Sequence, residues 1–258
     1  MRLSSIYTWS YRISYIYLVL PFIIFCIGWL NLPASILFTA IAIWATYQVL
    51  QTTPADDPQP AKLSKKIILV SVAILGVWVL LSGVGGYAFQ NWDHHWRNAV
   101  FRDLINYQWP VIYPTQDIAD VNTPLAMLAY YVGFWLPAAS IGKLFGWEIA
   151  NLSLFIWTWV GVVLVVVLLQ KRFKAAPLAV ILLLIFFSGM DILGMLLRHR
   201  INPLDAFSFW PPIARLENWT TLVQYSSNTT QLFWVFNQAI PSWLVIVLFI
   251  TQKNDPFS

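Results

Sequence analysis

Long apolar runs dominate the pattern of hydrophobic and polar positions along the chain. A transmembrane helix needs about 20 mostly apolar residues, and the runs lack the strict alternation of barrel strands. The clearest runs are 13–30, 33–50, 67–84, 150–170 and 176–197. A last run, 240–250, is long enough only if its helix begins near Gln231 and passes Pro241 with a kink. The pattern predicts an all-α fold, a polytopic transmembrane bundle of about six spans.

Polar segments divide this bundle into two parts. Residues 1–66 form an N-terminal hairpin followed by a linker rich in proline and lysine, and residues 67–258 form a larger membrane module with polar loops at about 87–149 and 198–239. Lysines in short loops favour the cytoplasmic side. We therefore expect a multi-pass protein of the plasma (inner) membrane, with a cytoplasmic N-terminus and with both large loops outside.

Segment 123–146 has two interpretations, a further span or a pair of in-plane helices at the membrane surface. The division of lysine and arginine residues between the two sides of the membrane is the same for both interpretations. The compact basic cluster at 171–174 favours the in-plane alternative, because the orientation rule is strongest for short loops. Its prolines and tyrosines also suit a broken interfacial helix.

Composition supports a membrane protein and excludes several other classes. Hydrophobic residues make up 59% of the chain and charged residues 10%, whereas soluble domains carry about 25% charged residues. The net charge of +4 is what basic cytoplasmic loops produce, so it gives no support to a nucleic-acid partner. The single cysteine, Cys26, excludes an intrachain disulfide and a cysteine-based metal site.

The stretch 91–114, NWDHHWRNAVFRDLINYQWPVIYP, is the strongest candidate for a working surface. Asp93 and Arg97 are one helical turn apart and share a face. A carboxylate can take a proton from an acceptor hydroxyl, and arginine binds phosphate bidentately. The alternative is a solvated ion pair worth well under about 1 kcal/mol. Neighbouring His94 and His95 point about 100° apart, which disfavours a shared metal ion.

Three further features are candidates for binding or support. Asp103 lies roughly 15 Å along the same helix from Asp93, so we expect it to brace the loop. Asp191 lies within an apolar run, where an acid signals either a functional cavity or a structural hydrogen bond, and both alternatives stay open. The loop 198–239 combines aromatic rings with amides and hydroxyls, which suits either a carbohydrate site or a membrane interface.

The order of these motifs resembles the first part of the GT-C superfamily of membrane glycosyltransferases. The resemblance covers about 85–174 and rests on an acid that opens the first large loop, followed by the motifs Arg102–Leu104, Trp109–Val111, Pro124-Leu125, Tyr130-Tyr131 and Lys143–Gly146. Those enzymes transfer a sugar from a polyprenyl-phosphate carrier on the outer face. The resemblance implies that Asp93 is the catalytic residue.

The same resemblance gives the expected partners and binding residues. The partners are a polyprenyl-phosphate-linked sugar and membrane lipid, with no resident cofactor, although a divalent metal is left open. The residues expected to bind the phosphate or the sugar are Arg97, Arg102, Asp191, Arg198, Trp96, Gln224 and Tyr225.

The chain departs from the family in two ways. His94 follows Asp93 where family members often carry a second acid, and the chain is shorter, with fewer spans than usual. The second departure allows a fragment that is truncated at its C-terminus, a split subunit or a degenerate relative. The alternative function is therefore a non-catalytic membrane subunit, or a lipid or polysaccharide carrier component, working with a second membrane subunit.

Overall fold

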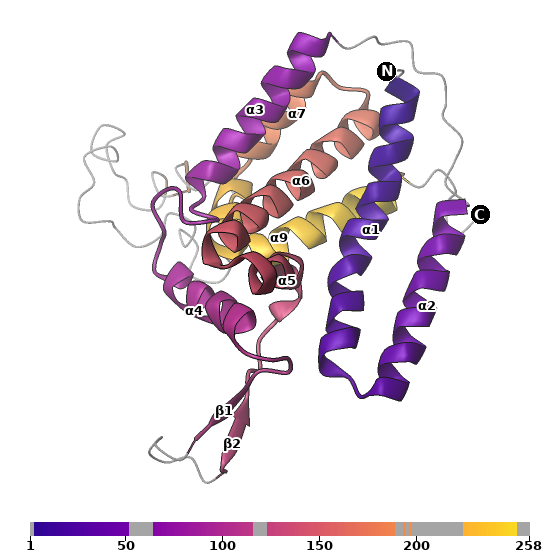
Figure 1. The fold of residues 1–258 in the computed structure, drawn as a ribbon. Coiled ribbons are helices and arrows are strands. Elements are labelled where there is room, and N and C mark those ends of the chain that lie inside the picture. Colours follow the sequence, from indigo (N-terminus) through magenta and orange to yellow (C-terminus); the bar gives the residue numbers. More distant parts are fainter. Residues whose placement is uncertain are drawn as a thin grey trace.

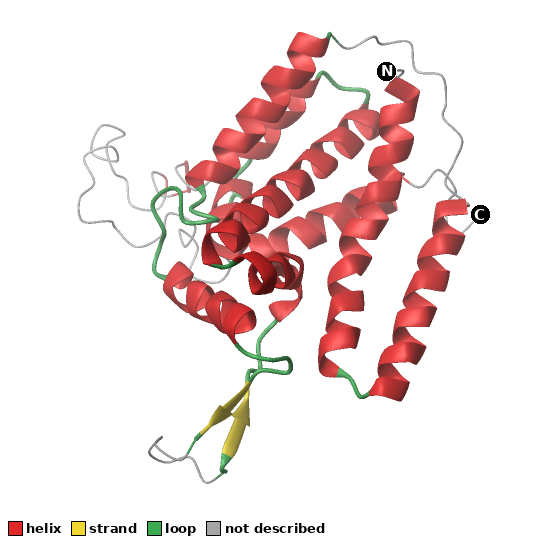
Figure 2. Cartoon of the chain, in the orientation of Figure 1, coloured by secondary structure: helices red, strands yellow, loops and turns green. Residues whose placement is uncertain are grey.

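The computed structural model describes residues 3–51, 64–115, 123–188, 193, 194, 197 and 224–251. This part of the chain is mainly helical, with two short strands (Figure 2). The helices are α1 (Leu3–Trp29), α2 (Leu32–Gln51), α3 (Lys65–Leu81), α4 (Asp93–Asn106), the 3-10 helix η1 (Val132–Trp135), α5 (Leu136–Phe145), α6 (Trp147–Phe173), α7 (Pro177–Phe186) and α9 (Asn228–Thr251).

Four of these helices are long and apolar enough to cross a membrane, namely α1, α2, α6 and α9. They confirm four of the predicted spans, including the last. Helix α9 begins at Asn228, three residues before the predicted start, and continues past Pro241. Its break lies at Val235, where φ is −139° and ψ is 37°. The structure thus describes a membrane-embedded helical protein.

The other two predicted spans have shorter helices. Helix α3 has 17 residues and ends at Leu81 with Ser82 as its C-cap, and the following turn places Gly83, Gly85 and Gly86 at positive φ. Helix α7 has ten residues, because Phe187 adopts an extended backbone with ψ of 121°. Ten residues extend about 15 Å, half of the hydrocarbon core. The prediction of one uninterrupted helix over 176–197 is therefore wrong.

Segment 123–146 contains no helix of spanning length. Strand β2 (Leu125–Met127) comes first and pairs antiparallel with β1 (Ile112–Pro114), so that Tyr113 lies opposite Ala126. The 3-10 helix η1 and the ten-residue α5 follow, and Gly146 at φ +83° ends α5. The hairpin projects away from the helices (Figure 1). The all-α prediction missed it, because both strands are only three residues long.

Helix α6 lies at the centre of the bundle and packs against α1, α3, α5, α7 and α9. Gly161 lets α6 and α9 approach each other closely, since a Cβ at this position would lie 2.5 Å from Ile240 of α9. In contrast, α2 lies at one edge and, within the described part of the chain, packs substantially against α1 alone (Figure 1). Helix α4 lies below the bundle, against α5.

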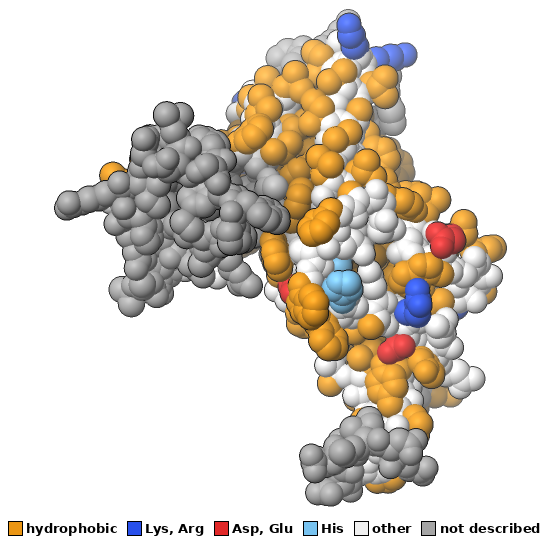
Figure 3. Space-filling view, turned by 90° about the vertical axis from the view of Figure 1, so that its left-hand side faces the viewer, with side chains coloured by type: hydrophobic (Ala, Val, Ile, Leu, Met, Phe, Trp, Pro, Cys, Tyr) orange, Lys and Arg blue, Asp and Glu red, His pale blue; other side chains and the backbone are white. Residues whose placement is uncertain are grey.

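Charged side chains are distributed unevenly over the molecule. On the face shown in Figure 3, hydrophobic side chains cover most of the upper half. Acidic, basic and histidine side chains gather lower down, and further basic side chains lie at the top. An apolar zone between two polar ends is the arrangement that a bilayer selects.

Candidate functional site

The start of α4 is fixed against the start of α9 by Asn91. Its side-chain oxygen accepts a hydrogen bond from the backbone N–H of Asp93 at 3.1 Å, and its amide nitrogen donates to the carbonyl of Phe233 at 2.8 Å. Asp93 thereby occupies the first turn of α4, where the helix dipole stabilises a negative charge. One side chain thus brings the sequence-predicted acid next to the last helix.

Asp93 and Arg97 form an ion pair, with Nη2 of Arg97 3.2 Å from Oδ2 of Asp93. The alternative of a solvated ion pair does not fit Arg97, because its side chain is 5% exposed whereas that of Asp93 is 42% exposed. Among the residues that the structure describes, none accepts a hydrogen bond of regular geometry from the Nε or Nη1 atom of Arg97. Burying a guanidinium is costly unless its donors are satisfied. Arg97 therefore has unused capacity to bind an anion.

Aromatic rings surround the Arg97 guanidinium. Its central carbon lies 5.7 Å from the ring centroid of Phe236, a residue of α9. The phenol of Tyr130 lies on another side. Burial raises the pKa of Tyr130, the neighbouring Tyr131 hydroxyl raises it further, and Arg97 acts in the opposite direction. These rings exclude water and so strengthen any charge interaction that Arg97 makes.

His94 is the second buried polar residue of this cluster. Its ring stacks on Phe236 with centroids 5.8 Å apart, and its Nδ1 lies 3.4 Å from the Nε2 of Gln90. Burial lowers the pKa of His94, and the positive charge of Arg97 lowers it further. The ring is thus neutral at physiological pH. Backbone hydrogen bonds to Phe233 and Ser82 act against this lowering, although the Nε2 atom makes no hydrogen bond of regular geometry in the described part of the chain.

Phe236 is the residue of this site that sequence reasoning missed. It is 1% exposed and lies between His94, Arg97, Phe134 and Trp135. Its position in an apolar run gives no signal of this role, because nothing in the spacing pairs α9 with α4. The sequence therefore predicted Asp93 and Arg97 as members of the site but not Phe236, the aromatic residue that covers Arg97.

The structure does not bring the other predicted binding residues to this ion pair. Arg102 is exposed and lies 4.7 Å over the ring of Trp147, and Trp96 is 66% exposed. Gln224 donates to Ser226 at 3.0 Å, and Tyr225 is 53% exposed beside Phe187. The remaining two, Asp191 and Arg198, lie outside the described residues.

Asp103 has the structural role expected for it. Its Oδ2 accepts a hydrogen bond of 2.6 Å from the hydroxyl of Tyr113 in β1. This bond ties the projecting hairpin to α4. Asp103 therefore makes a suitable matched control for Asp93, because both are acids on one helix with different partners.

No three metal-ligating side chains come together among the described residues. His94 is buried whereas His95 is exposed, so the adjacent histidines face different surroundings. The question of a divalent metal stays open.

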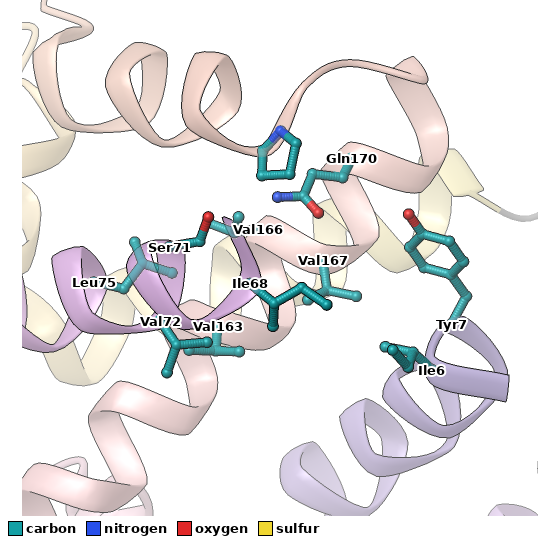
Figure 4. A pocket seen from close by; sticks show the side chains of 11 residues that line it. Ile6, Tyr7, Ile68, Ser71, Val72, Leu75, Val163, Val166, Val167 and Gln170 are labelled. Atoms are coloured by element: carbon teal, nitrogen blue, oxygen red, sulfur yellow. The ribbon is translucent and has the colours of Figure 1, made fainter. Parts of the chain in front are cut away.

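One small cavity lies far from α4, among α1, α3, α6 and the start of α7 (Figure 4). Its volume is about 60 Å³, and its lining is almost entirely apolar, with Ser71 and Gln170 as exceptions. Ligand sites usually have about 300 Å³ or more. This cavity is too small to hold a sugar.

Comparison of the chain with protein-family models, curated proteins and solved structures finds no match. The function is therefore argued from the residues and their geometry.

Proposed function

We propose that the chain is a membrane glycosyltransferase that moves a sugar from a polyprenyl-phosphate carrier to a cell-surface or lipid acceptor. The observation that carries this proposal is the pairing of Asp93 with Arg97. Asp93 is half-exposed and can meet an acceptor, whereas Arg97 is buried and has two nitrogens without hydrogen-bond partners in the described part of the chain. A general base beside an unsatisfied cation is the combination that transfer from a phosphate needs.

The reaction assigns one role to each member of the pair. The Asp93 carboxylate takes the proton of the acceptor hydroxyl while the oxygen of that hydroxyl attacks the anomeric carbon of the sugar. The bond from that carbon to the phosphate oxygen breaks, and negative charge grows on the departing lipid phosphate. Arg97 stabilises that charge in surroundings from which Phe236 and Tyr130 exclude water. Neutral His94 beside it adds no competing positive charge.

The orientation in the membrane is part of the proposal. Lys65 and Lys66 begin α3, and Lys171 and Arg172 lie in the last turn of α6. These ends lie together at the opposite end of the bundle from α4 (Figure 1). The positive-inside rule then supports a cytoplasmic N-terminus, with α4 and the hairpin on the extracytoplasmic face of the plasma membrane.

A subunit that binds the lipid phosphate without catalysis is the second candidate. Its supporting observation is the burial of Arg97, since one cation with free donors suffices for binding. The two candidates differ in what they require of Asp93, because a binding subunit needs no base. The test of the proposal is therefore a test of that carboxylate.

Asp93→Asn should lower sugar transfer by about a hundredfold or more while binding of a polyprenyl phosphate persists, because the amide keeps the volume and loses the basicity. Arg97→Lys should lower both the affinity and the rate, because lysine lacks the planar fork of arginine. Transfer is measured with a radiolabelled sugar from membrane lipid extracts. Binding is measured by thermophoresis of the purified protein.

Asp103→Asn is the control, because its side-chain oxygen still accepts the Tyr113 hydrogen bond and it lies outside the ion pair. It should retain transfer at matched protein level. Full transfer by Asp93→Asn would remove the catalytic assignment and leave the binding subunit as the better description.

A further inference from the structure

A larger cavity of about 310 Å³ lies between α1, η1, α6 and α9. Its volume falls in the range of small-molecule sites. It is separate from the Asp93 and Arg97 pair, neither of which lines it. The walls are mainly aromatic and proline side chains, and no charged side chain is among the lining residues.

One wall of this cavity carries a buried polar side chain without partners. Asn237 of α9 is 6% exposed, and neither its Oδ1 nor its Nδ2 makes a hydrogen bond within the described part of the chain. Buried amides in native proteins are nearly always bonded. An amide with both functions unused on a cavity wall is therefore a candidate ligand contact.

Two prolines at the same cavity each remove the usual hydrogen-bond donor of a main-chain carbonyl. Pro21 of α1 and Pro241 of α9 both line the cavity, as do Tyr17 and Asn237, the residues four positions before them. Proline has no N–H, so each removes the usual helical partner of the carbonyl four residues earlier. The break at Val235 further disturbs α9 just before Asn237. Within the described part of the chain, the indole Nε1 of Trp157, another lining residue, also makes no hydrogen bond. The lining thus offers both acceptors and donors, which favours a hydroxyl, because a hydroxyl can donate and accept.

Tyr17 and Trp157 form an aromatic part of the lining. The ring of Tyr17 stacks on Trp157 with centroids 3.8 Å apart, and its hydroxyl donates to the Trp157 carbonyl at 3.1 Å. This bond uses the Tyr17 hydroxyl within the protein. The Asn237 side chain, by contrast, makes no hydrogen bond within the described part of the chain.

The position of the cavity indicates where its ligand comes from. Phe22 lines it and is 48% exposed on α1, a helix of spanning length, whereas Asn237 is buried at the inner side. A molecule dissolved in the bilayer can therefore enter past α1. A buried charge without a counter-charge is costly at this depth, so the lining selects a neutral molecule.

We propose that this cavity binds the polar end of an uncharged, hydroxyl-bearing lipid of the long-chain alcohol class. The lipid hydroxyl donates to Asn237 or to the carbonyl oxygens beside the prolines and accepts from the Asn237 amide. The first carbons lie against Trp157 and Phe22, and the rest of the chain lies along α1 in the bilayer. This site goes beyond the proposed transferase function, because it needs neither a phosphate nor a carboxylate.

The test uses a long-chain alcohol that carries a photoreactive diazirine, with the full-length protein in phosphatidylcholine nanodiscs. Crosslinked peptides are mapped by mass spectrometry. We expect labelling of the α1 and α9 segments that line the cavity and competition by unlabelled alcohol. The corresponding alkane lacks the donor, and the corresponding alkyl sulfate carries a permanent charge. Both should label these segments at least fivefold less.

Gly133 provides a matched pair of variants. A Cβ there would meet only Pro21, at 4.0 Å, so Gly133→Ala should fold and label like the wild type. Gly133→Leu should fill the cavity and lower labelling at least fivefold. Asn237→Leu should lower labelling by the alcohol to the level of the alkane, without loss of folded protein. Equal labelling by alcohol and alkane, or undiminished labelling in both Gly133→Leu and Asn237→Leu, would overturn the proposal.

Discussion

Gly161→Ala should destabilise the bundle at the point where α1, α6 and α9 meet. A Cβ at this position would lie 2.5 Å from Cγ2 of Ile240 and 2.6 Å from the hydroxyl oxygen of Tyr17. Neither neighbour can move freely. Ile240 is fully buried, and Tyr17 is held by its stacking and its hydrogen bond to Trp157.

The expected loss of unfolding free energy in Gly161→Ala is the sum of three contributions. Overpacking of a well-packed core costs about 1–3 kcal/mol. Loss of the Tyr17 hydrogen bond adds about 0.5–1.5 kcal/mol. The higher helix propensity of alanine offsets up to about 1 kcal/mol of this. With the full offset, the net loss of unfolding free energy is about 0.5–3.5 kcal/mol, which lowers the apparent Tm by roughly 1–14 °C for a chain of this size.

The assay is the fraction of protein that remains monodisperse in size-exclusion chromatography after aliquots in detergent are heated. Gly133→Ala serves as the control, because its Cβ has room, and it should match the wild type to within about a degree. If Gly161→Ala proved as stable as the wild type, the close approach of α1 and α9 to α6 would be wrong.

Two further predictions concern pH and topology. Burial lowers the pKa of His94 and the charge of Arg97 lowers it further, whereas backbone hydrogen bonds to Phe233 and Ser82 and the charge of Asp93 oppose them. The pKa remains lowered, so the folded protein resists a proton that the unfolded chain accepts. Stability should therefore fall as pH drops below the ordinary value of about 6.5, and His94→Gln should flatten the fall in apparent Tm between about pH 7.5 and 5.5. His95→Gln, at an exposed position of the same helix, should leave the fall unchanged. In a Cys26→Ser background, Leu144→Cys, at a position 78% exposed, should react with an impermeant thiol reagent from outside. Phe173→Cys should react only in opened membranes, and the reverse pattern would invert the proposed orientation.

The long helices could be predicted from the sequence because an apolar run of spanning length has one stable solution in a bilayer. The break after Phe186 was missed because the run was judged by its overall hydropathy, although Ser188, Gly189 and Asp191 follow it closely in the sequence. The hairpin was also missed. Its strands β1 and β2 lie apart in the sequence, and no local pattern of residues specifies that they pair. Non-local pairing leaves little trace in short strands.

The candidate site divides in the same way. Helical spacing alone placed Asp93 and Arg97 in contact, and the structure has that contact. The same spacing could not show that Arg97 is buried, because Phe236 of α9 covers it. Arg102 lies five residues further along α4, about 140° around the helix, and stacks on Trp147 instead. Side-chain surroundings depend on segments that meet only in the folded bundle.

The hydrogen bond between Tyr17 and Trp157 has a consequence for the order of assembly during synthesis, because its partners are 140 residues apart. A ribosome that adds about 5–20 residues per second needs roughly 7–28 s to make the intervening chain. During that interval α1 is already long enough to enter the bilayer, but α6 and α9 do not yet exist. Helix α2 follows α1 after two residues and packs substantially against α1 alone within the described part of the chain. Helix α2 is therefore the first helix available to pack against α1, before the central helix α6 is made.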